Sequence, residues 1–509
     1  MVAEALAKPL RRQMLSGRQR VRMESTMSDL ELKDIQGLVV RGYGSLEAAC
    51  YIPLQIQDGE AARHWLVTLA DQITNADTRP THTALNVAFT HAGLVDLGLD
   101  AETLASFPNE FTEGMTSERS RRVLGDHGEN APEKWVWGGP NTPPVQILLI
   151  CFAVDEPTLE TFSGSLSRGF SGVAQIGETL TTILLRDPQT GYSKEHFGFR
   201  DAISEPLIEG LGKSGPPATT VKAGEFILGY PNEYDLLTER PTVRVERDSQ
   251  GLLPDDPSES GVRDLGRNGS YLVFRQLHQD VGRFWQFQDD ATKDAVGNSD
   301  PEAQVRLAAK MVGRWPSGAP LVRAADQDNP ELGQENDFGY HDTDPLGRRC
   351  PLGAHIRRTN PRDSLDPNLG PQKTLATNKR HRILRRGRPY GDPVSASMQI
   401  EDIMSADKSG DRGLHFICFN ANIGRQFEFV QQTWINNPKF AGLYEDTDPL
   451  IGDRGPREIM HANVFTEQAM PARRRVTDLP QYVFVRGGAY FFMPGIRALR
   501  YLGSLKALP

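Results

Sequence analysis

The stretch Ala48–Phe89 has the sequence AACYIPLQIQDGEAARHWLVTLADQITNADTRPTHTALNVAF. Its two ends, Ala48–Ile56 and Thr83–Phe89, are short apolar runs of strand length. Between them, Gly59–Ala76 places apolar side chains three or four residues apart, which is the spacing of one helix face. These apolar positions are Ala62, Trp65, Leu66, Leu69 and Ile73. We therefore expect a strand, a helix and a second strand in this order.

A second group of elements follows a helical, loop-rich insert. The residue patterns predict a strand at Val145–Val154, a helix at Thr158–Phe170 and a strand at Ala174–Leu185. Together with the first three elements they give the order β-α-β-β-α-β, which is the split pattern of a ferredoxin-like unit.

The same order of elements recurs later in the chain. The predicted strands are Ser270–Leu277, Arg382–Arg385, Gly413–Asn420 and Gln481–Phe492, and the predicted helices are Asp280–Ala295 and Ile423–Trp434. We therefore expect an α+β fold in which two ferredoxin-like (βαββαβ) halves pack together, with long loop and helical inserts. The two halves show no sequence repeat, so this prediction rests on element order.

The two halves are expected to join near Leu207–Gly224. We assign residues 30–215 to the N-terminal half and residues 216–509 to the C-terminal half. Residues 1–29 are basic and lack the apolar core of a signal peptide, so we interpret them as a disordered leader. The pair Arg11–Arg12 is similar to a twin-arginine signal, but no hydrophobic region follows it. Export is therefore the alternative to a cytoplasmic location.

The composition argues against several classes of protein. The 509 residues carry a net charge of -9, whereas nucleic-acid-binding domains usually have a basic face. The longest apolar run, Ile147–Val154, is too short to span a bilayer, so we expect a soluble protein without a membrane partner. The 4 cysteines are widely spread and form no C-x-x-C pair, which indicates a reducing compartment rather than a disulfide framework. A homo-oligomer is left open.

Three segments concentrate residues that can do chemistry. They are HFGFRDAISEP (His196–Pro206), CPLGAHIRRTNPR (Cys350–Arg362) and HRILRRGRPYG (His381–Gly391). By residue type alone, an aspartate between glycine and proline is most often a turn former, and a single histidine is more often structural than a ligand. Arginine clusters are either solvated or bind an anion. The residues alone therefore indicate an anion-binding enzyme of unspecified chemistry.

These segments, taken together, resemble the dye-decolorising peroxidases. GFRDAISEP is similar to the G-x-x-D-G signature of that family, GAHIRRTNPR to its proximal-histidine segment and ILRRGRPYG to the strand that carries its distal arginine. The stretch RGLHFICFNANIGRQFEFVQQTW (Arg412–Trp434) resembles the family's penultimate strand and helix. All four occur in the family's order, and the resemblance extends from about Leu30 to the C-terminus.

The resemblance implies a haem-b peroxidase with two ferredoxin-like halves and the haem held mainly by the second half. It implies hydrogen peroxide as oxidant and bulky aromatic dyes or phenols as reductants, oxidised in one-electron steps. By position, His355 matches the axial iron ligand, Asp201 the distal acid and Arg385 the distal arginine. The chain has no C-x-x-C-H motif, so the haem is expected to be non-covalent.

These residue types suit peroxide cleavage. Splitting the O–O bond unevenly requires a proton to move from the inner to the outer oxygen, which a distal carboxylate can carry. Asp201 must be deprotonated when peroxide arrives, which predicts an acidic pH optimum if it is the main proton carrier. Arg385 would stabilise the departing negative charge through fixed N–H donors. The signature's closing glycine is Ala202 here, which would be strained if that position needs a positive φ.

Other residues receive secondary roles. Leu414 and Phe416 share one strand face, which in the family lines the distal pocket, although ordinary core packing explains them equally well. Arg357 or Arg358 would pair with the haem propionates. Glu428 is a candidate hydrogen-bond partner for the proximal imidazole.

Three alternatives stay open. The first is a protein that binds or transfers haem without peroxidase turnover, and the presence of both Asp201 and Arg385 argues against it. The second is a related haem enzyme that uses chlorite or another oxyanion, against which the G-x-x-D segment speaks. In the third, Cys350 would ligate iron as a thiolate in place of His355.

Overall fold

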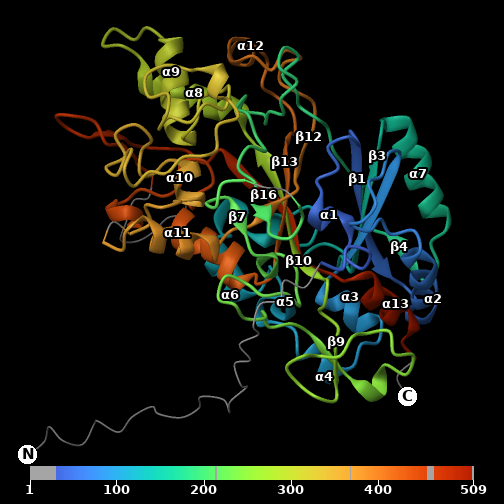
Figure 1. Ribbon diagram of the computed structural model, residues 1–509. Helices are drawn as coiled ribbons and strands as arrows, with labels where there is room; N and C mark the ends of the chain where they lie inside the picture. The colour runs from blue at the N-terminus through green and yellow to red at the C-terminus, as the bar shows by residue number, and fades with distance from the viewer. Residues whose placement is uncertain (1–29, 213–214, 367, 455–462, 507–509) are drawn as a thin grey trace, which may run out of the picture.

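A computed structural model describes residues 30–212, 215–366, 368–454 and 463–506. The predicted leader, residues 1–29, lies outside them. One 10-stranded sheet runs through this part of the chain in the order β11-β13-β10-β16-β2-β3-β1-β4, and β12 and β5 pair with β13 and β1. Residues from both halves contribute to it, which gives the molecule a single backbone frame (Figure 1).

The N-terminal half contributes one side of this sheet. Its elements are β1 (Ala48–Ile56), α2 (Gly59–Ala70), β2 (Thr83–Phe89), β3 (Ile147–Ala153), α7 (Glu156–Arg168), β4 (Val173–Gln175) and β5 (Leu180–Thr181). All 7 residues of β3 are buried, because it lies between β1 and β2 and is covered on both faces. The single strand predicted for Ala174–Leu185 is wrong: the chain turns at Gly177, where φ is 61°, and splits it into β4 and β5.

The C-terminal half repeats the arrangement. Its elements are β10 (Ser270–Gln279), α8 (Val281–Thr292), β11 (Leu384–Arg385), β12 (Arg388–Tyr390), β13 (Gly413–Asn420) and β16 (Val483–Met493). The helix after β13 consists of two π-helical segments, Gly424–Glu428 and Val430–Ile435. In each half the first and third strands are neighbours at the centre, with the second and fourth outside them. The α+β prediction is confirmed, and the strand order is the same in both halves.

Shorter elements fill the connections. The remaining α-helices are α1 (Gly37–Val40), α3 (His91–Asp96), α4 (Ala101–Leu104), α5 (Asn109–Glu113), α6 (Glu118–Leu124), α9 (Pro301–Val312), α10 (His355–Thr359), α11 (Pro371–Lys379), α12 (Ile400–Ser405) and α13 (Ile496–Ser504). The remaining strands are β6 (Leu207–Ile208), β7 (Thr220–Val221), β8 (Thr242–Arg244), β9 (Val262–Asp264), β14 (Phe465–Glu467) and β15 (Arg474–Val476). Figure 1 shows α2 and α7 on one side of the molecule and α8–α11 on the other, with β10, β13 and β16 between them.

The two halves meet where β16 pairs with β2, at Phe492 and Phe89. Both phenylalanines are buried, and Phe107 packs edge-on against Phe492 at a centroid distance of 5.3 Å. The predicted boundary at residues 215/216 lies between β6 and β7, which form a short parallel pair. Because one sheet spans both halves, this domain boundary stays a prediction. Aromatic packing therefore stabilises the joint between the halves.

All 4 cysteines are unpaired and buried. Within the described ranges, no helix combines the length and apolar character needed to cross a membrane.

Candidate functional site

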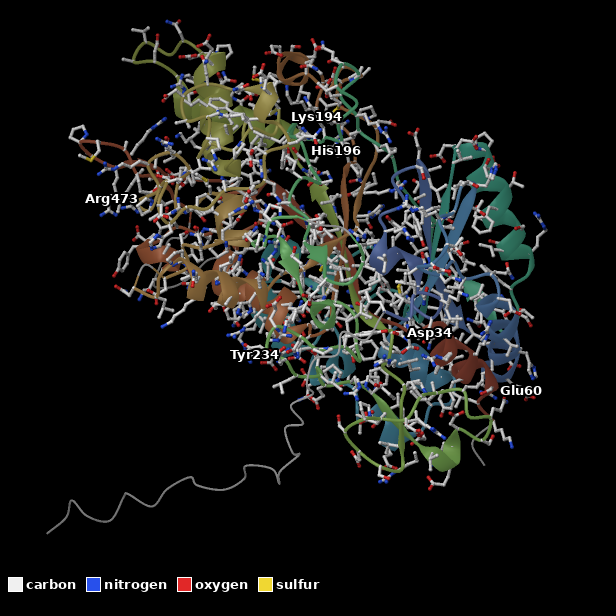
Figure 2. All side chains as sticks on the ribbon, viewed as in Figure 1. Asp34, Glu60, Lys194, His196, Tyr234 and Arg473 are labelled. Atoms are coloured by element: carbon white, nitrogen blue, oxygen red, sulfur yellow. The ribbon has the colours of Figure 1, made fainter. Side chains whose placement is uncertain are left out.

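The loop that carries Asp201 is fixed to the C-terminal half by the residues just before it. Nε2 of His196 lies 2.9 Å from the carbonyl oxygen of Tyr390, and the Lys194 ammonium donates to the carbonyl of Met398 at 2.7 Å. Burial lowers the pKa of His196 to about 4, so the ring is neutral and its Nε2–H is the donor. Figure 2 shows Lys194 and His196 together at the end of β12 and β13.

Glu195 shapes the same loop. Its carboxylate accepts the backbone N–H groups of Phe197 at 2.9 Å and Phe199 at 3.0 Å, and the side-chain amide of Gln279 at 2.7 Å. Burial raises the pKa of Glu195 to about 7 in spite of these bonds. The loop before Asp201 is therefore closed around a desolvated carboxyl group.

Arg385 lies between two carboxylates of this loop. Its Nη1 is 3.3 Å from Oδ1 of Asp201, and its Nη2 is 2.7 Å from Oε1 of Glu205. The second oxygen of Glu205 accepts the backbone N–H of Arg385 at 2.8 Å, so Glu205 holds the residue at two points. The charge of Glu205 is the largest cause that keeps the pKa of Arg385 above its ordinary value. The structure thus brings together Asp201 and Arg385, as expected, and adds Glu205.

Ala202, next to Asp201, adopts a left-handed backbone conformation with φ of 61°. Its N–H donates to Oδ1 of Asp201 at 2.6 Å. A side chain disfavours this conformation, which glycine adopts at no steric cost. The strain expected for alanine at this position is therefore present, directly beside the acid.

His355 begins helix α10, and its ring is oriented by a buried aspartate. Nδ1 of His355 lies 2.9 Å from Oδ2 of Asp448, whose other oxygen accepts the N–H groups of Leu450 and Ile451. Burial alone would raise the pKa of Asp448, but the charge and hydrogen bond of His355 bring it below its ordinary value. Asp448 is therefore an ionised acceptor, and Nδ1 donates to it. Nε2 forms no hydrogen bond with any residue that the structure describes.

Asp448 takes the place expected for Glu428, so that prediction is wrong. Both oxygens of Glu428 accept from Arg119, at 3.1 and 2.7 Å, and Oε1 also accepts from the hydroxyl of Tyr490. This cluster links α6 to the C-terminal strands and does not involve His355. Asp448 lies 93 residues beyond the histidine in an irregular stretch, where no periodic pattern points to it.

Arg357 and Arg358, which were expected to pair with haem propionates, are bound to protein groups in this structure. Arg357 donates to Asp344 at 3.2 Å and to the carbonyl of Cys350 at 2.9 Å. Arg358 is fully buried and donates to backbone carbonyls, among them those of Trp434 at 2.7 Å and Asp446 at 2.7 Å. Both guanidinium groups therefore fix helix α10 within the fold.

Cys350 lies in the apolar packing between α9 and α10. Helix α9 is followed by Gly313, whose φ is 98°. A Cβ added there would lie 2.4 Å from Cγ1 of Ile356 and 3.3 Å from Sγ of Cys350. Burial raises the pKa of the Cys350 thiol to about 11. A protonated, enclosed thiol is a poor iron ligand, which disfavours the thiolate alternative.

Leu414 and Phe416 lie on the face of β13 that also presents Arg385. Residue 385 is directly opposite Cys418 in the β11–β13 ladder, and Leu414, Phe416 and Cys418 share a face because side chains alternate along a strand. Leu414 and Phe416 are half-buried, whereas His415 between them is buried. Two half-buried apolar side chains therefore lie on the same sheet face as Arg385.

Comparison with known proteins gives the family. The model described as "Dyp-type peroxidase, C-terminal" matches residues 258–442. A dye-decolorizing peroxidase of Mycena epipterygia is 32% identical over 469 residues, which cover 86% of this chain and 79% of that protein. The chain belongs to the dye-decolorizing peroxidase family. Its enzyme class, predicted from four sequence segments, is thereby confirmed.

Solved structures of this family share the fold. A fungal DyP-type peroxidase from Auricularia auricula-judae has a TM-score of 0.73 at 26% identity, covering 94% of this chain and 100% of that chain. A dye-decolorizing peroxidase solved in complex with 2,6-dimethoxyphenol has a TM-score of 0.73 at 27% identity, covering 93% of this chain and 100% of that chain. The chain is therefore a DyP-type peroxidase, and DyP-type peroxidases are haem enzymes.

The donor set in this chain fits a haem. The imidazole of His355 has its Nδ1 bound to Asp448 and its Nε2 unpaired among the described residues, which is how a metal-ligating histidine is arranged. Asp201 and Arg385 lie in contact on a loop and a strand that are distant in sequence from His355. A carboxylate and an arginine in contact suit the cleavage of a bound peroxide.

Replacing Ala202 by glycine should stabilise the protein. The left-handed conformation destabilises folded alanine by about 1–2 kcal/mol, and glycine removes this strain. Glycine also raises the entropy of the unfolded chain, so the net gain in the free energy of unfolding should be about 0.5–1 kcal/mol. Urea unfolding of the haem-free protein measures this free energy. Ala131→Gly is the matched control, since φ is -57° there and the same substitution should destabilise. An Ala202→Gly variant no more stable than the wild type would contradict the strain.

The stability of the protein should depend on Glu195 between pH 4.5 and 7. Folded Glu195 keeps its proton up to a pH of about 7, whereas the unfolded side chain ionises near its ordinary pKa of 4.5. Raising the pH through this interval therefore favours the unfolded chain, by at most about 1.4 kcal/mol per pH unit. Denaturant unfolding across this range should show wild type losing stability relative to Glu195→Gln, with a constant difference above pH 7. Parallel pH profiles for the two proteins would show that Glu195 titrates normally.

Proposed function

We propose that the chain is a haem-b peroxidase that reduces hydrogen peroxide and oxidises bulky aromatic dyes and phenols in one-electron steps. The observation that carries this proposal is the position of Arg385 between Asp201 and Glu205, with an Asp448-bound His355 on a different segment. Bound haem would supply an iron centre that takes oxidising equivalents from peroxide and passes them on singly to the reductant.

His355 would hold the haem through Nε2. Hydrogen bonding of Nδ1–H to an ionised carboxylate makes the imidazole more basic and fixes both its tautomer and its orientation. Asp448 is itself held by two backbone N–H groups, so the ring has one preferred position. Arg358 fixes the same helix by bonding to backbone carbonyls around it.

Asp201 would move the proton. Its carboxylate accepts the proton of the inner peroxide oxygen and returns it to the outer oxygen, which then leaves as water. Oδ1 is already bound to Arg385 and to the N–H of Ala202, which leaves Oδ2 as the oxygen that carries the proton. The side chain is more than a third exposed, so peroxide can reach it.

Arg385 would stabilise the negative charge on the departing oxygen. Its guanidinium is fixed in advance by Glu205, so little reorganisation is needed when charge develops. Leu414 and Phe416 lie on the same strand face and would exclude water from this side. Glu205 is thus a positioning residue that acts through Arg385.

A haem carrier without turnover is the alternative function. Binding or transferring haem requires an axial ligand and a pocket but no proton shuttle. The paired Asp201 and Arg385, together with the family membership of the chain, favour the peroxidase. The G-x-x-D segment that contains Asp201 also disfavours a chlorite-using enzyme.

The proposal is tested by the absorption spectrum of the haem-reconstituted protein before and after one equivalent of hydrogen peroxide. We expect a Soret band of a histidine-ligated ferric haem that shifts within seconds and returns when a phenol or dye is added. Haem that binds but only bleaches would support the carrier, and absence of haem binding would contradict the whole proposal.

Asp201→Asn and Arg385→Leu should each retain haem but lose most peroxide turnover. Loss of a positioned acid–base group or oxyanion donor typically costs about 10²–10⁴-fold in rate. Stopped-flow absorption measures the reaction with peroxide. Glu335→Gln is the control, because it replaces a carboxylate in the connection before α10. This variant should react with peroxide at the wild-type rate. Full reactivity in an Asp201→Asn, Arg385→Leu double variant would overturn the assigned roles.

Asp448→Asn should keep the fold but weaken the haem site. Removing the negative partner of Nδ1 makes the imidazole less basic, and changes of this kind typically cost about 10–100-fold in metal affinity or activity. Haem affinity is measured by titration and the Fe–His stretching frequency of the ferrous protein by resonance Raman. The frequency should fall in Asp448→Asn and stay unchanged in Glu428→Gln. Equal shifts in both variants would contradict the assignment of Asp448.

A further inference from the structure

A cavity of about 680 Å³ lies between α2, α13 and the loop that joins β8 to β9. Figure 1 shows α13 beside α2, and Glu60, labelled in Figure 2, marks the α2 side of the cavity. Asp201, Arg385 and His355 do not line it. Its volume is typical of sites for small molecules. We call it the α2–α13 cavity.

The walls of the α2–α13 cavity are fixed by contacts within the protein. Arg500 of α13 pairs with Asp71, which directly follows α2, at 3.0 Å. In the loop between β8 and β9, the buried carboxylate of Asp248 accepts the backbone N–H groups of Leu252 at 3.0 Å and Leu253 at 2.8 Å. The cavity is therefore formed before any ligand arrives.

Arg63 lines this cavity from α2 and is buried without an opposing charge. It is 7% exposed, its Nη1 donates to the carbonyl of Leu97 at 3.1 Å, and no ion pair joins it to a described residue. Arg240, which is 8% exposed, instead pairs with Asp256 at 2.7 Å and with Asp264 at 2.5 Å. Burying an unpaired guanidinium destabilises a protein, so Arg63 favours an anion as its neighbour.

The guanidinium of Arg63 keeps donors for such a neighbour. Of its five N–H groups, those on Nε and Nη2 form no hydrogen bond with the residues that the structure describes. Nε and Nη2 together provide the two parallel N–H groups with which arginine binds both oxygens of a carboxylate. The donor geometry therefore suits a carboxylate ligand.

The other charged residues around the cavity leave a positive excess. Asp71 is paired with Arg500, so these two charges compensate each other. The remaining acidic residue of the lining is Glu60, which is exposed, and it stands against the positive charges of Arg63 and Lys506. The cavity can therefore take up one negative charge.

Apolar side chains form the rest of the wall that matters for a ligand. They are Val67 of α2, Leu252 of the loop and Leu505 at the end of α13. Val67 is 45% exposed, which leaves an apolar surface uncovered in the same cavity as the buried arginine. An apolar wall with one charged anchor is typical of sites for organic anions.

We propose that the α2–α13 cavity binds a small organic carboxylate. Arg63 binds the carboxylate group, and Val67, Leu252 and Leu505 contact the apolar part of the ligand. This site is separate from the haem site and does not rest on the proposed function.

The test compares benzoate with benzamide, which has a similar shape but no charge. Binding to the full-length protein, with and without haem, is measured by isothermal titration calorimetry. Benzoate should bind at least about 10-fold more tightly than benzamide, because only benzoate forms a charge-assisted contact with arginine. Added salt should weaken the binding of benzoate alone. The absorption spectrum of the haem, recorded in the same titration, should not change.

Arg63→Gln should weaken the binding of benzoate by about 10-fold or more and leave that of benzamide unchanged. The matched control is Arg168→Gln, which removes an exposed arginine at the end of α7 in the same half of the protein. This control should bind both compounds as the wild type does.

A second variant keeps the proposal testable if Arg63→Gln fails to fold. Val67→Asp places a carboxylate in the cavity wall, and its position is 45% exposed, so the fold should tolerate it. It should abolish the preference for benzoate, because like charges repel. Val95→Asp, at a position on α3 that is 44% exposed and outside the cavity, should keep that preference.

Several results would overturn the proposal. They are absence of benzoate binding, equal binding of benzoate and benzamide, and benzoate binding that persists in Arg63→Gln. Benzoate binding seen only with a change in the haem spectrum would place the ligand at the haem and would also contradict it. Inorganic phosphate that binds more tightly than benzoate, with loss of binding in Arg63→Gln, would show a site for an inorganic anion instead. None of these results bears on the peroxidase assignment.

Discussion

The contact of the Arg385 guanidinium with Asp201 and Glu205 is the constraint on which the site depends. Arg385 belongs to a two-residue strand on the edge of the C-terminal sheet, and both carboxylates come from a loop about 180 residues earlier. His196 attaches this loop to β12, and Lys194 attaches it to the segment before α12. A single ion cluster thus ties this loop to the sheet and sets the relative positions of Asp201, Glu205 and Arg385.

His355 is positioned by a different kind of contact. Helix α10 has only five residues, too few to be stable by itself, and it is fixed by two buried arginines that bond to surrounding carbonyls and to Asp344. Its first residue, His355, is then oriented by Asp448. Arg357 and Arg358 therefore hold the short helix from which His355 projects.

Much of the fold could be predicted because apolar runs bounded by turns define strands. Ala48–Ile56 and Gly413–Asn420 agree with the structure residue by residue, whereas Ala174–Leu185 failed at a left-handed glycine. In the candidate site, the motifs singled out Asp201, Arg385 and His355, and the structure places the first two in contact. Sequence could not indicate Asp448 as the partner of His355, because the partner of a buried charge is decided by tertiary packing between distant segments.

The most direct test of this account is chemical rescue of a His355→Gly variant. The variant is reconstituted with haem, and its absorption spectrum and reaction with hydrogen peroxide are measured with and without imidazole. The account predicts weak haem binding and slow reaction alone, with the wild-type spectrum and most of the peroxide reactivity restored by imidazole. A His355→Gly variant that binds haem with an unchanged spectrum and reacts fully without imidazole would contradict the assignment of His355 and the arrangement of the site around it.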